Sequence, residues 1–225
     1  LAEGSARAAL AYQLGALKVE RLEDKGGAVE AFREALGLVA HHGPSLGALE
    51  ALLRDDAWRV RVAEILEPEF AQTGDHARLA WVLQILLEAA SDAAARRGLA
   101  LRLAGVYAEA LNDARQGFEL LRTTLREQPD AEDVADSLAE LALVGGWSDE
   151  FAASLAEIAR REGLDEAVRV RLARRAAAVY DERLDDPAAA EPFHRMVIDA
   201  GGLDAHAFGA LRRLYQDRQR WDDLR

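Results

Sequence analysis

Three segments of the chain align without gaps around an aspartate, and this internal repeat limits the possible folds more than any other feature. The anchors are Asp24, Asp113 and Asp186. Leucine stands 14 and two residues before each anchor and 25 and 28 after it, and leucine or alanine stands ten before it. Steps of three, four and seven form the apolar stripe of an amphipathic helix. The repeat therefore predicts helices that bury their stripes against neighbouring copies.

The spacing of the anchors predicts how many helices each repeat holds. Asp113 and Asp186 are 73 residues apart, which fits two helix–turn–helix pairs of about 36 residues. Asp24 and Asp113 are 89 residues apart, so one additional short helix is expected between about 43 and 57. This register aligns segment 62–87 with 134–159, and a rival register aligns the tryptophans instead. The predicted repeat units are about 1–91, 92–164 and 165–225.

Glycine, proline and aspartate punctuate the chain at the junctions between the predicted helices. Pro187 suits a first helical turn, and four polar residues are expected near N-caps: Asp130, Ser148, Asp165 and Asp204. A thirteenth helix is expected to begin at Trp221, which suggests an internal piece of a longer array. The twelve preceding helices are predicted at 5–23, 26–41, 45–54, 56–72, 75–90, 92–111, 114–128, 131–144, 147–162, 165–184, 187–200 and 203–218.

Composition excludes several classes of protein. The chain has no cysteine, which rules out disulfide scaffolds, thiolate metal sites and cysteine nucleophiles. No run of about 18 apolar residues could span a membrane, and no signal peptide begins the chain, so a cytoplasmic location is expected. The net charge of −12 argues against nucleic acid as the main partner, because binding phosphates needs a basic surface. Scarce aromatic and β-branched residues disfavour a β-sheet.

The spacing of small and aromatic residues resembles the tetratricopeptide repeat (TPR) family. Ala28, Phe32 and Ala35 fit the second helix of that repeat, and the pair Leu14-Gly15 fits its first helix. The set Gly117, Leu121, Thr124 and Pro129 fits with substitutions, and Ala190, His194 and Val197 occupy the same positions in the third copy. The chain is similar to the long Ala-, Leu- and Arg-rich TPR arrays of large bacterial proteins. The resemblance implies a right-handed α–α superhelix of antiparallel helices with a concave, protein-binding groove.

Arginines run against the acidic charge of the chain and are the candidate partner-binding residues. The segment RVRLARR at 169–175 is strongly basic, and Arg102 and Arg175 share one repeat offset. By analogy with TPR-like arrays, in which the first helix of each pair lines the groove, Arg171 and Arg174 are expected to face a partner. Tyr12 and Leu101 lie at related offsets. The alternative is that these arginines pair with Glu and Asp of neighbouring helices.

These observations predict a non-catalytic scaffold or adaptor that binds a protein or peptide, with acidic character selected by the arginines. No nucleophile–base set, phosphate-binding glycine loop or metal-binding motif occurs in the sequence, so no catalytic, metal or cofactor site is expected. Two alternatives remain open. In the first, the chain is a regulatory or substrate-recruiting array of a larger enzyme. In the second, it is an architectural spacer with no dedicated ligand.

Overall fold

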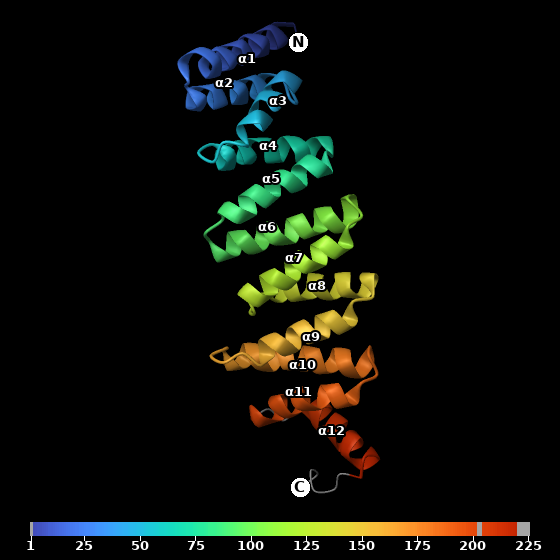
Figure 1. Cartoon of the computed structure of the whole chain (residues 1–225). Helices are drawn as coiled ribbons and strands as arrows, with labels where there is room; N and C mark the ends of the chain where they lie inside the picture. The colour runs from blue at the N-terminus through green and yellow to red at the C-terminus, as the bar shows by residue number, and fades with distance from the viewer. Residues whose placement is uncertain (1, 202–203, 220–225) are drawn as a thin grey trace. The chain divides into compact units, whose positions relative to one another are not determined.

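The computed structural model describes residues 2–201 and 204–219, and over these residues the chain is all-α (Figure 1). Twelve α-helices and one π-helical turn occupy this part of the chain, which contains no β-strand. Each helix packs mainly against its neighbours in the sequence, as expected for a helical repeat array. The predicted all-α, solenoid-like fold class is thereby confirmed. The thirteenth helix predicted at Trp221 lies outside the described residues.

The chain divides into two compact units at the second anchor, between Asp113 and Ala114. The proposed repeat units stay a prediction. The first compact unit holds α1 (Ala2–Leu22), α2 (Lys25–Leu38), α3 (Gly43–Leu52), α4 (Arg59–Thr73), α5 (His76–Ala89), α6 (Ala93–Gly105) and the π-turn η1 (Val106–Ala110). The second holds α7 (Ala114–Glu127), α8 (Glu132–Gly145), α9 (Ser148–Ala159), α10 (Glu166–Glu182), α11 (Pro187–Asp199) and α12 (Ala205–Asp217).

The three anchors have the same backbone geometry. The residue before each anchor is left-handed, with φ of 53° at Glu23, 54° at Asn112 and 50° at Asp185. The backbone N–H of each anchor then bonds the carbonyl six residues earlier, at distances of 3.0, 2.8 and 2.9 Å. This bond closes the helix end with a turn one residue wider than that of a Schellman motif, in which the N–H bonds the carbonyl five residues earlier. The sequence repeat is therefore also a repeat of one local structure.

The anchor aspartates also begin the next helix. Asp24 accepts a hydrogen bond from the backbone N–H of Gly27 at 2.8 Å, and Asp186 accepts one from Ala189 at 3.0 Å. Each carboxylate satisfies a donor that the first helical turn leaves without a partner. At Asp24 and Asp186, the backbone N–H therefore closes the first helix of a pair, and the side chain caps the second helix.

The additional helix predicted between residues 43 and 57 is α3, which begins with Pro44 in its first turn. The favoured register is also confirmed, because Gly74 and Gly146 end α4 and α8 with φ of 69° and 72°. Trp58 and Trp147 each occupy an N-cap position. Trp58 precedes α4, the first helix of its pair, whereas Trp147 precedes α9, the second helix of its pair. Their rival alignment therefore equates helices with different positions.

Small and apolar residues at the predicted repeat positions form the core. Ala28, Phe32 and Ala35 of α2 are buried, and so are Ala190, His194 and Val197 of α11. Asp165 and Asp204 cap α10 and α12 as predicted. The N-cap positions of α8 and α9 are Ala131 and Trp147, so Asp130 and Ser148 each lie one residue away from them. Among the described residues, no helix combines the length and apolar character that crossing a bilayer requires.

Candidate functional site

Arg171, Arg174 and Arg175 lie within one turn of α10, at the spacing that places side chains on one helix face. Arg171 reaches α8, where its Nη1 atom lies 3.1 Å from Oε1 of Glu132. Its Nη2 atom donates a hydrogen bond of 3.3 Å to the backbone carbonyl of Asp130. The first of the candidate arginines therefore joins two helices of the second unit.

Arg175 makes a similar link one turn further along α10. Its Nη1 atom lies 2.6 Å from Oδ1 of Asp136 on α8. Its guanidinium carbon also stands 5.7 Å from the centre of the Phe151 ring, within range of a cation–π contact. The ring and the carboxylate together fix the position of this cation.

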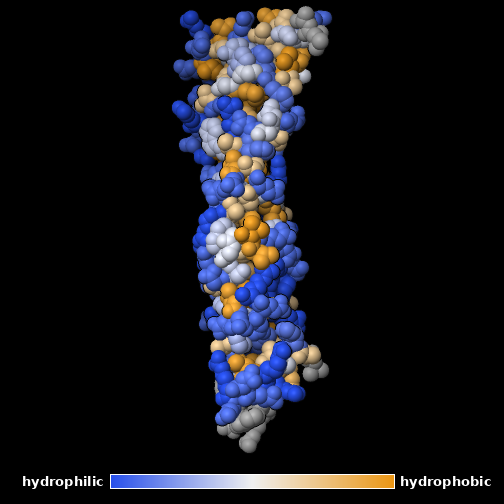
Figure 2. Space-filling model, turned by 90° about the vertical axis from the view of Figure 1, so that its right-hand side faces the viewer, coloured by the Kyte–Doolittle hydropathy of each residue, from blue (hydrophilic) through white to orange (hydrophobic). Residues whose placement is uncertain are grey.

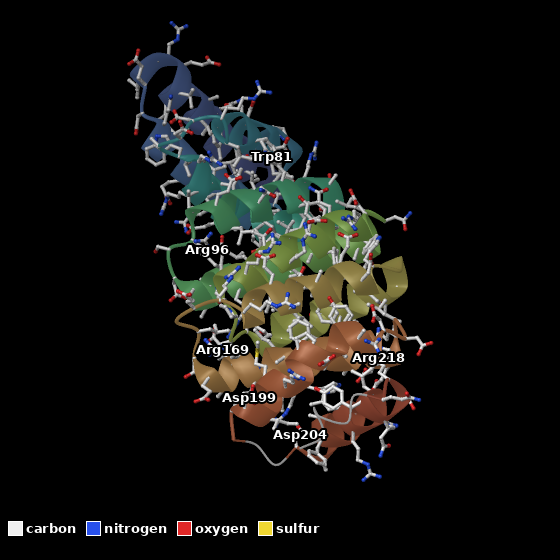
Figure 3. The ribbon with its side chains drawn as sticks, turned by 60° about the horizontal axis from the view of Figure 1, so that its bottom comes forward. Trp81, Arg96, Arg169, Asp199, Asp204 and Arg218 are labelled. Carbon is white, nitrogen blue, oxygen red and sulfur yellow. The ribbon has the colours of Figure 1, made fainter. Side chains whose placement is uncertain are left out.

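Arg174 extends in the other direction, to the start of α12. Its Nε atom lies 2.8 Å from Oδ2 of Asp204, which Figure 3 labels. Asp204 caps α12 by accepting hydrogen bonds of 3.0 Å from the backbone N–H groups of His206 and Ala207. The Ala207 N–H and the nearby Arg174 hold the pKa of Asp204 below its ordinary value, against the opposing effect of burial. The carboxylate therefore stays ionised to a lower pH than an ordinary aspartate does.

The structure brings these three arginines together but pairs each of them with a carboxylate. This is the alternative that the sequence left open, in which the arginines bind Glu and Asp of neighbouring helices. Glu132 and Asp136 are each 66% exposed, so water reaches both of these carboxylates. The result is a surface of three positioned cations, of whose partner carboxylates two lie largely in solvent and the third, Asp204, is only 17% exposed. We call Arg171, Arg174 and Arg175 the arginine surface.

The remaining sequence candidates lie in the first unit. Arg102 on α6 forms an ion pair with Glu67 on α4, so it resembles Arg175 in both repeat offset and contact. Leu101 is half-buried. Tyr12 is half-buried too, and its ring lies 5.8 Å from that of Phe32 and 6.0 Å from that of His42. Tyr12 therefore forms part of the packing between α1, α2 and the start of α3.

Exposed apolar side chains are the surface feature that sequence reasoning missed. Leu10, Leu14 and Leu17 of α1 are at least half exposed, and Trp81 on α5 is exposed as well (Figure 3). Figure 2 shows hydrophobic side chains at the surface at the level of α1 and α2. Leu10 and Leu14 belong to the repeated stripe and were expected to be covered. The spacing of these leucines in the sequence identifies an apolar face of α1. Whether that face is exposed depends on which helices pack against α1.

Four of the described histidines contact carboxylates, a hydroxyl or aromatic rings of neighbouring helices. His194 is buried, and its Nε2 atom lies 2.7 Å from Oδ2 of Asp181 on α10. The pair joins α10 to α11. Across residues 2–201 and 204–219, no cluster of three or more Asp, Glu, His or Cys side chains could hold a metal ion.

The hollows on the surface are open and charged. One of about 430 Å³ lies between α10 and α11, and Figure 3 labels Arg169 and Asp199 from its lining. Pro192 and Met196 supply its apolar part. Such a hollow lacks the enclosed apolar walls that small-molecule sites share.

Comparison with known proteins adds no family to this description, since no protein-family model and no curated protein matches the chain.

Proposed function

We propose that the chain is a non-catalytic, TPR-like binding module that holds an acidic segment of a partner protein on the arginine surface. The observation that supports the proposal is the arrangement of Arg171, Arg174 and Arg175 on one face of α10. Each guanidinium is held in place, yet two of the three partner carboxylates are 66% exposed. The right-handed superhelix and the TPR assignment are part of the same proposal.

The energetics favour exchange of carboxylates at this surface. An exposed ion pair contributes only about 0–1 kcal/mol to stability, so replacing Glu132 or Asp136 by a carboxylate of the partner costs little. Arginine can bind a carboxylate through two parallel hydrogen bonds, and cations that are already positioned lose little side-chain entropy on binding. The Phe151 ring beneath Arg175 contributes to that positioning. An acidic segment that spans one turn of α10 could therefore contact all three arginines.

A direct test uses a fluorescein-labelled peptide of twelve residues, rich in Glu and Asp, and measures its anisotropy as the protein is added. The Arg171→Glu/Arg174→Glu variant is expected to bind the peptide at least tenfold more weakly. Arg33→Glu is the matched control, because Arg33 also forms an exposed ion pair, with Glu30, but lies outside the arginine surface. Equal binding by the wild type and the double variant would contradict the proposal and favour a spacer role.

A second variant tests the exchange of carboxylates itself. Glu132→Gln/Asp136→Asn removes two internal competitors while leaving the arginines in place. The proposal predicts that this variant binds the acidic peptide several-fold more tightly than the wild type. Unchanged or weaker binding would mean that Glu132 and Asp136 do not compete with the ligand. In that case the ion pairs serve only to join α8 to α10.

A further inference from the structure

The inserted helix α3 opens a hollow between α2 and α4 in the interior of the first unit. In the second unit α7 packs directly against α8, whereas here α3 stands between α2 and α4 and packs against both (Figure 1). The hollow has a volume of about 430 Å³ and is lined by α2 between Arg33 and Gly37 and by α4 between Arg61 and Glu69. Helix α2 also packs against α1, and α4 against α5, so each wall has a neighbouring helix on both sides. We call this feature the α2–α4 hollow.

Two contacts between its walls close the α2–α4 hollow at its ends. Glu30 on α2 forms an ion pair with Arg61 at the start of α4. At the other end, Nδ1 of His41 lies 2.8 Å from Oε2 of Glu69, and the backbone N–H of His41 donates to the same oxygen at 3.2 Å. The two helices therefore run in the same direction. From Arg61 to Glu69 the hollow extends over about 12 Å, roughly the length of four extended residues.

The middle of the hollow is apolar and has room for further side chains. Leu36, Ile65 and Pro68 line it between the two end contacts. Leu36 is buried and Ile65 is half-buried, so both present only part of their surface to the hollow. Gly37 also lines it, and a β-carbon built on Gly37 would meet no atom within 4 Å. The wall formed by α2 is therefore open at Gly37, where an apolar side chain of a ligand has space.

Pro68 adds a hydrogen-bond acceptor to the same hollow. It lies inside α4 and has no N–H, so the carbonyl of Glu64, four residues earlier, lacks its usual helical partner. Glu64 and Pro68 both line the hollow, which places this carbonyl on that side of α4. The repeat places Glu140 at the position of Pro68 in α8, and that helix contains no proline. The additional acceptor thus distinguishes α4 from its repeat equivalent, and a main-chain N–H is the donor that suits it.

The charges of the hollow are separated along its length. Arg33 and Arg61 lie at the end that Glu30 closes, and their side chains are 60% and 53% exposed. Both guanidiniums bond the one carboxylate of Glu30, which leaves N–H donors on each for a second carboxylate. Glu64 and Glu69 lie further along α4, where they repel acidic side chains. A ligand with one acidic end and an apolar remainder therefore matches these charges.

We propose that the α2–α4 hollow binds an extended segment of a partner protein in which one acidic residue is followed by apolar residues. The carboxylate binds Arg33 and Arg61, the apolar side chains fill the centre beside Gly37, and a main-chain N–H donates to the carbonyl of Glu64. The carboxylates further along α4 exclude a uniformly acidic segment, so this ligand differs from that of the arginine surface. The inference rests on the proposed function only in assigning the chain a protein-binding role.

The probe is the peptide acetyl-Asp-Val-Leu-Val-amide, titrated into the protein in a calorimeter. Saturable binding to the wild type is expected, and a tetra-glutamate peptide with the same end groups should not bind. Gly37→Leu should reduce the affinity at least tenfold, because the new side chain enters the space that the ligand needs. Gly98→Leu in α6 is the matched control, since a β-carbon there also meets no atom within 4 Å, and it should bind like the wild type. Circular dichroism should show the same helix content for both variants.

Pro68→Ala tests the acceptor in the hollow. The alanine N–H can bond the carbonyl of Glu64, so this variant should unfold at a higher urea concentration and yet bind the peptide several-fold more weakly. A peptide methylated at its main-chain nitrogens should lose affinity for the wild type and lose little further for Pro68→Ala. Equal losses for the two proteins would overturn the proposal, because the carbonyl would then make no contact with the ligand.

Further variants test the charges and separate this site from the proposed function. Arg33→Gln/Arg61→Gln should weaken the aspartate peptide at least tenfold and leave an asparagine version unchanged, whereas Arg171→Glu/Arg174→Glu should leave both unchanged. If the acidic peptide of twelve residues fails to bind while this peptide binds, the arginine surface is wrong and the hollow stands. The absence of saturable binding, or equal binding by Gly37→Leu, overturns the present proposal. So does binding of N-acetylaspartate amide as tightly as the peptide, because the hollow would then take a small anion.

Discussion

The ring of Phe32 packs directly against the backbone of Gly15, and a β-carbon on Gly15 would stand 2.5 Å from Cε1 of that ring. Two further ring atoms would lie within 2.9 Å, so the whole ring would have to move. Phe32 is buried, so its ring cannot move without disturbing the packed core. This contact brings α1 and α2 close together and explains the glycine of the Leu14-Gly15 pair.

Replacement of Gly15 by alanine should therefore destabilise the protein by about 1–3 kcal/mol, the usual cost of overpacking a core. Gly98→Ala is the matched control, because Gly98 lies within α6 and a β-carbon there meets no atom within 4 Å. That variant should gain about 0.5–1 kcal/mol from the lower entropy of its unfolded chain. Urea unfolding followed by circular dichroism measures both. A lower midpoint for Gly98→Ala than for Gly15→Ala would contradict this account of the α1–α2 contact.

The left-handed residues before the anchors should be sites of stabilisation. A non-glycine residue in this region costs about 1–2 kcal/mol, and glycine adopts it without strain. Glu23→Gly and Asp185→Gly should each raise stability by about 0.5–1 kcal/mol, seen as a higher urea midpoint. Asn112→Gly should gain less, because asparagine tolerates this conformation better. A loss of stability in both acidic variants would mean that their side chains contribute more than the strain costs.

Most of the fold was predictable because it depends on local sequence. Helix ends follow from the anchor aspartates and from Gly74 and Gly146, whose preferences act within a few residues. The π-turn of Val106–Ala110 was missed, and a continuous helix was expected over 92–111. There the N–H of Leu111 bonds the carbonyl of Val106, five residues earlier, which widens the last turn.

The candidate site was less predictable because its contacts join residues far apart in the sequence. Arg171 and Glu132 are 39 residues apart, and no local pattern identifies Glu132 as the partner. The stripe of α1 poses the same difficulty. Leu14 and Leu103 stand at one repeat offset, yet one is half exposed and the other fully buried. Sequence periodicity shows that a face is apolar, and only the packing of neighbouring helices determines whether that face is covered.

Arg115 on α7 is predicted to stabilise the second unit by joining α7 to α9. Its two terminal nitrogens bind both carboxylate oxygens of Glu150 on α9, at 2.6 and 2.8 Å. Its guanidinium carbon also lies 5.0 Å from the ring centre of Trp147 and 5.4 Å from that of Phe118. Lysine cannot reproduce the two parallel bonds, so Arg115→Lys should lower the urea midpoint despite the partial exposure of the pair.

Urea unfolding of Arg115→Lys, compared with Arg33→Lys, measures this difference. Arg33 forms a single exposed ion pair with Glu30, so its replacement should change stability by less than about 0.5 kcal/mol. Equal and small effects of the two substitutions would show that the rings and the second hydrogen bond contribute nothing. A large effect of Arg115→Lys alone would support Arg115 as the link between α7 and α9.

Acid should destabilise the second unit through its paired carboxylates. The hydrogen bond from Arg115 lowers the pKa of Glu150 from 4.5, and that from Arg126 lowers the pKa of Glu157 from the same value. A carboxylate whose pKa is lower in the folded state stabilises the fold at pH values above its unfolded pKa. That contribution is lost as the pH falls through the folded pKa. Stability should therefore be level above about pH 5.5 and decline progressively below about pH 4.5.

Urea midpoints measured from pH 7 to pH 3 test this dependence. Glu150→Gln should be less stable than the wild type at pH 7, because Arg115 and Arg122 both lose a charged partner. Its stability should also fall less on acidification, because one of the titrating carboxylates is gone. The two curves should therefore converge as the pH approaches 3. Parallel curves would show that the Arg115–Glu150 pair does not contribute to the acid sensitivity of this unit.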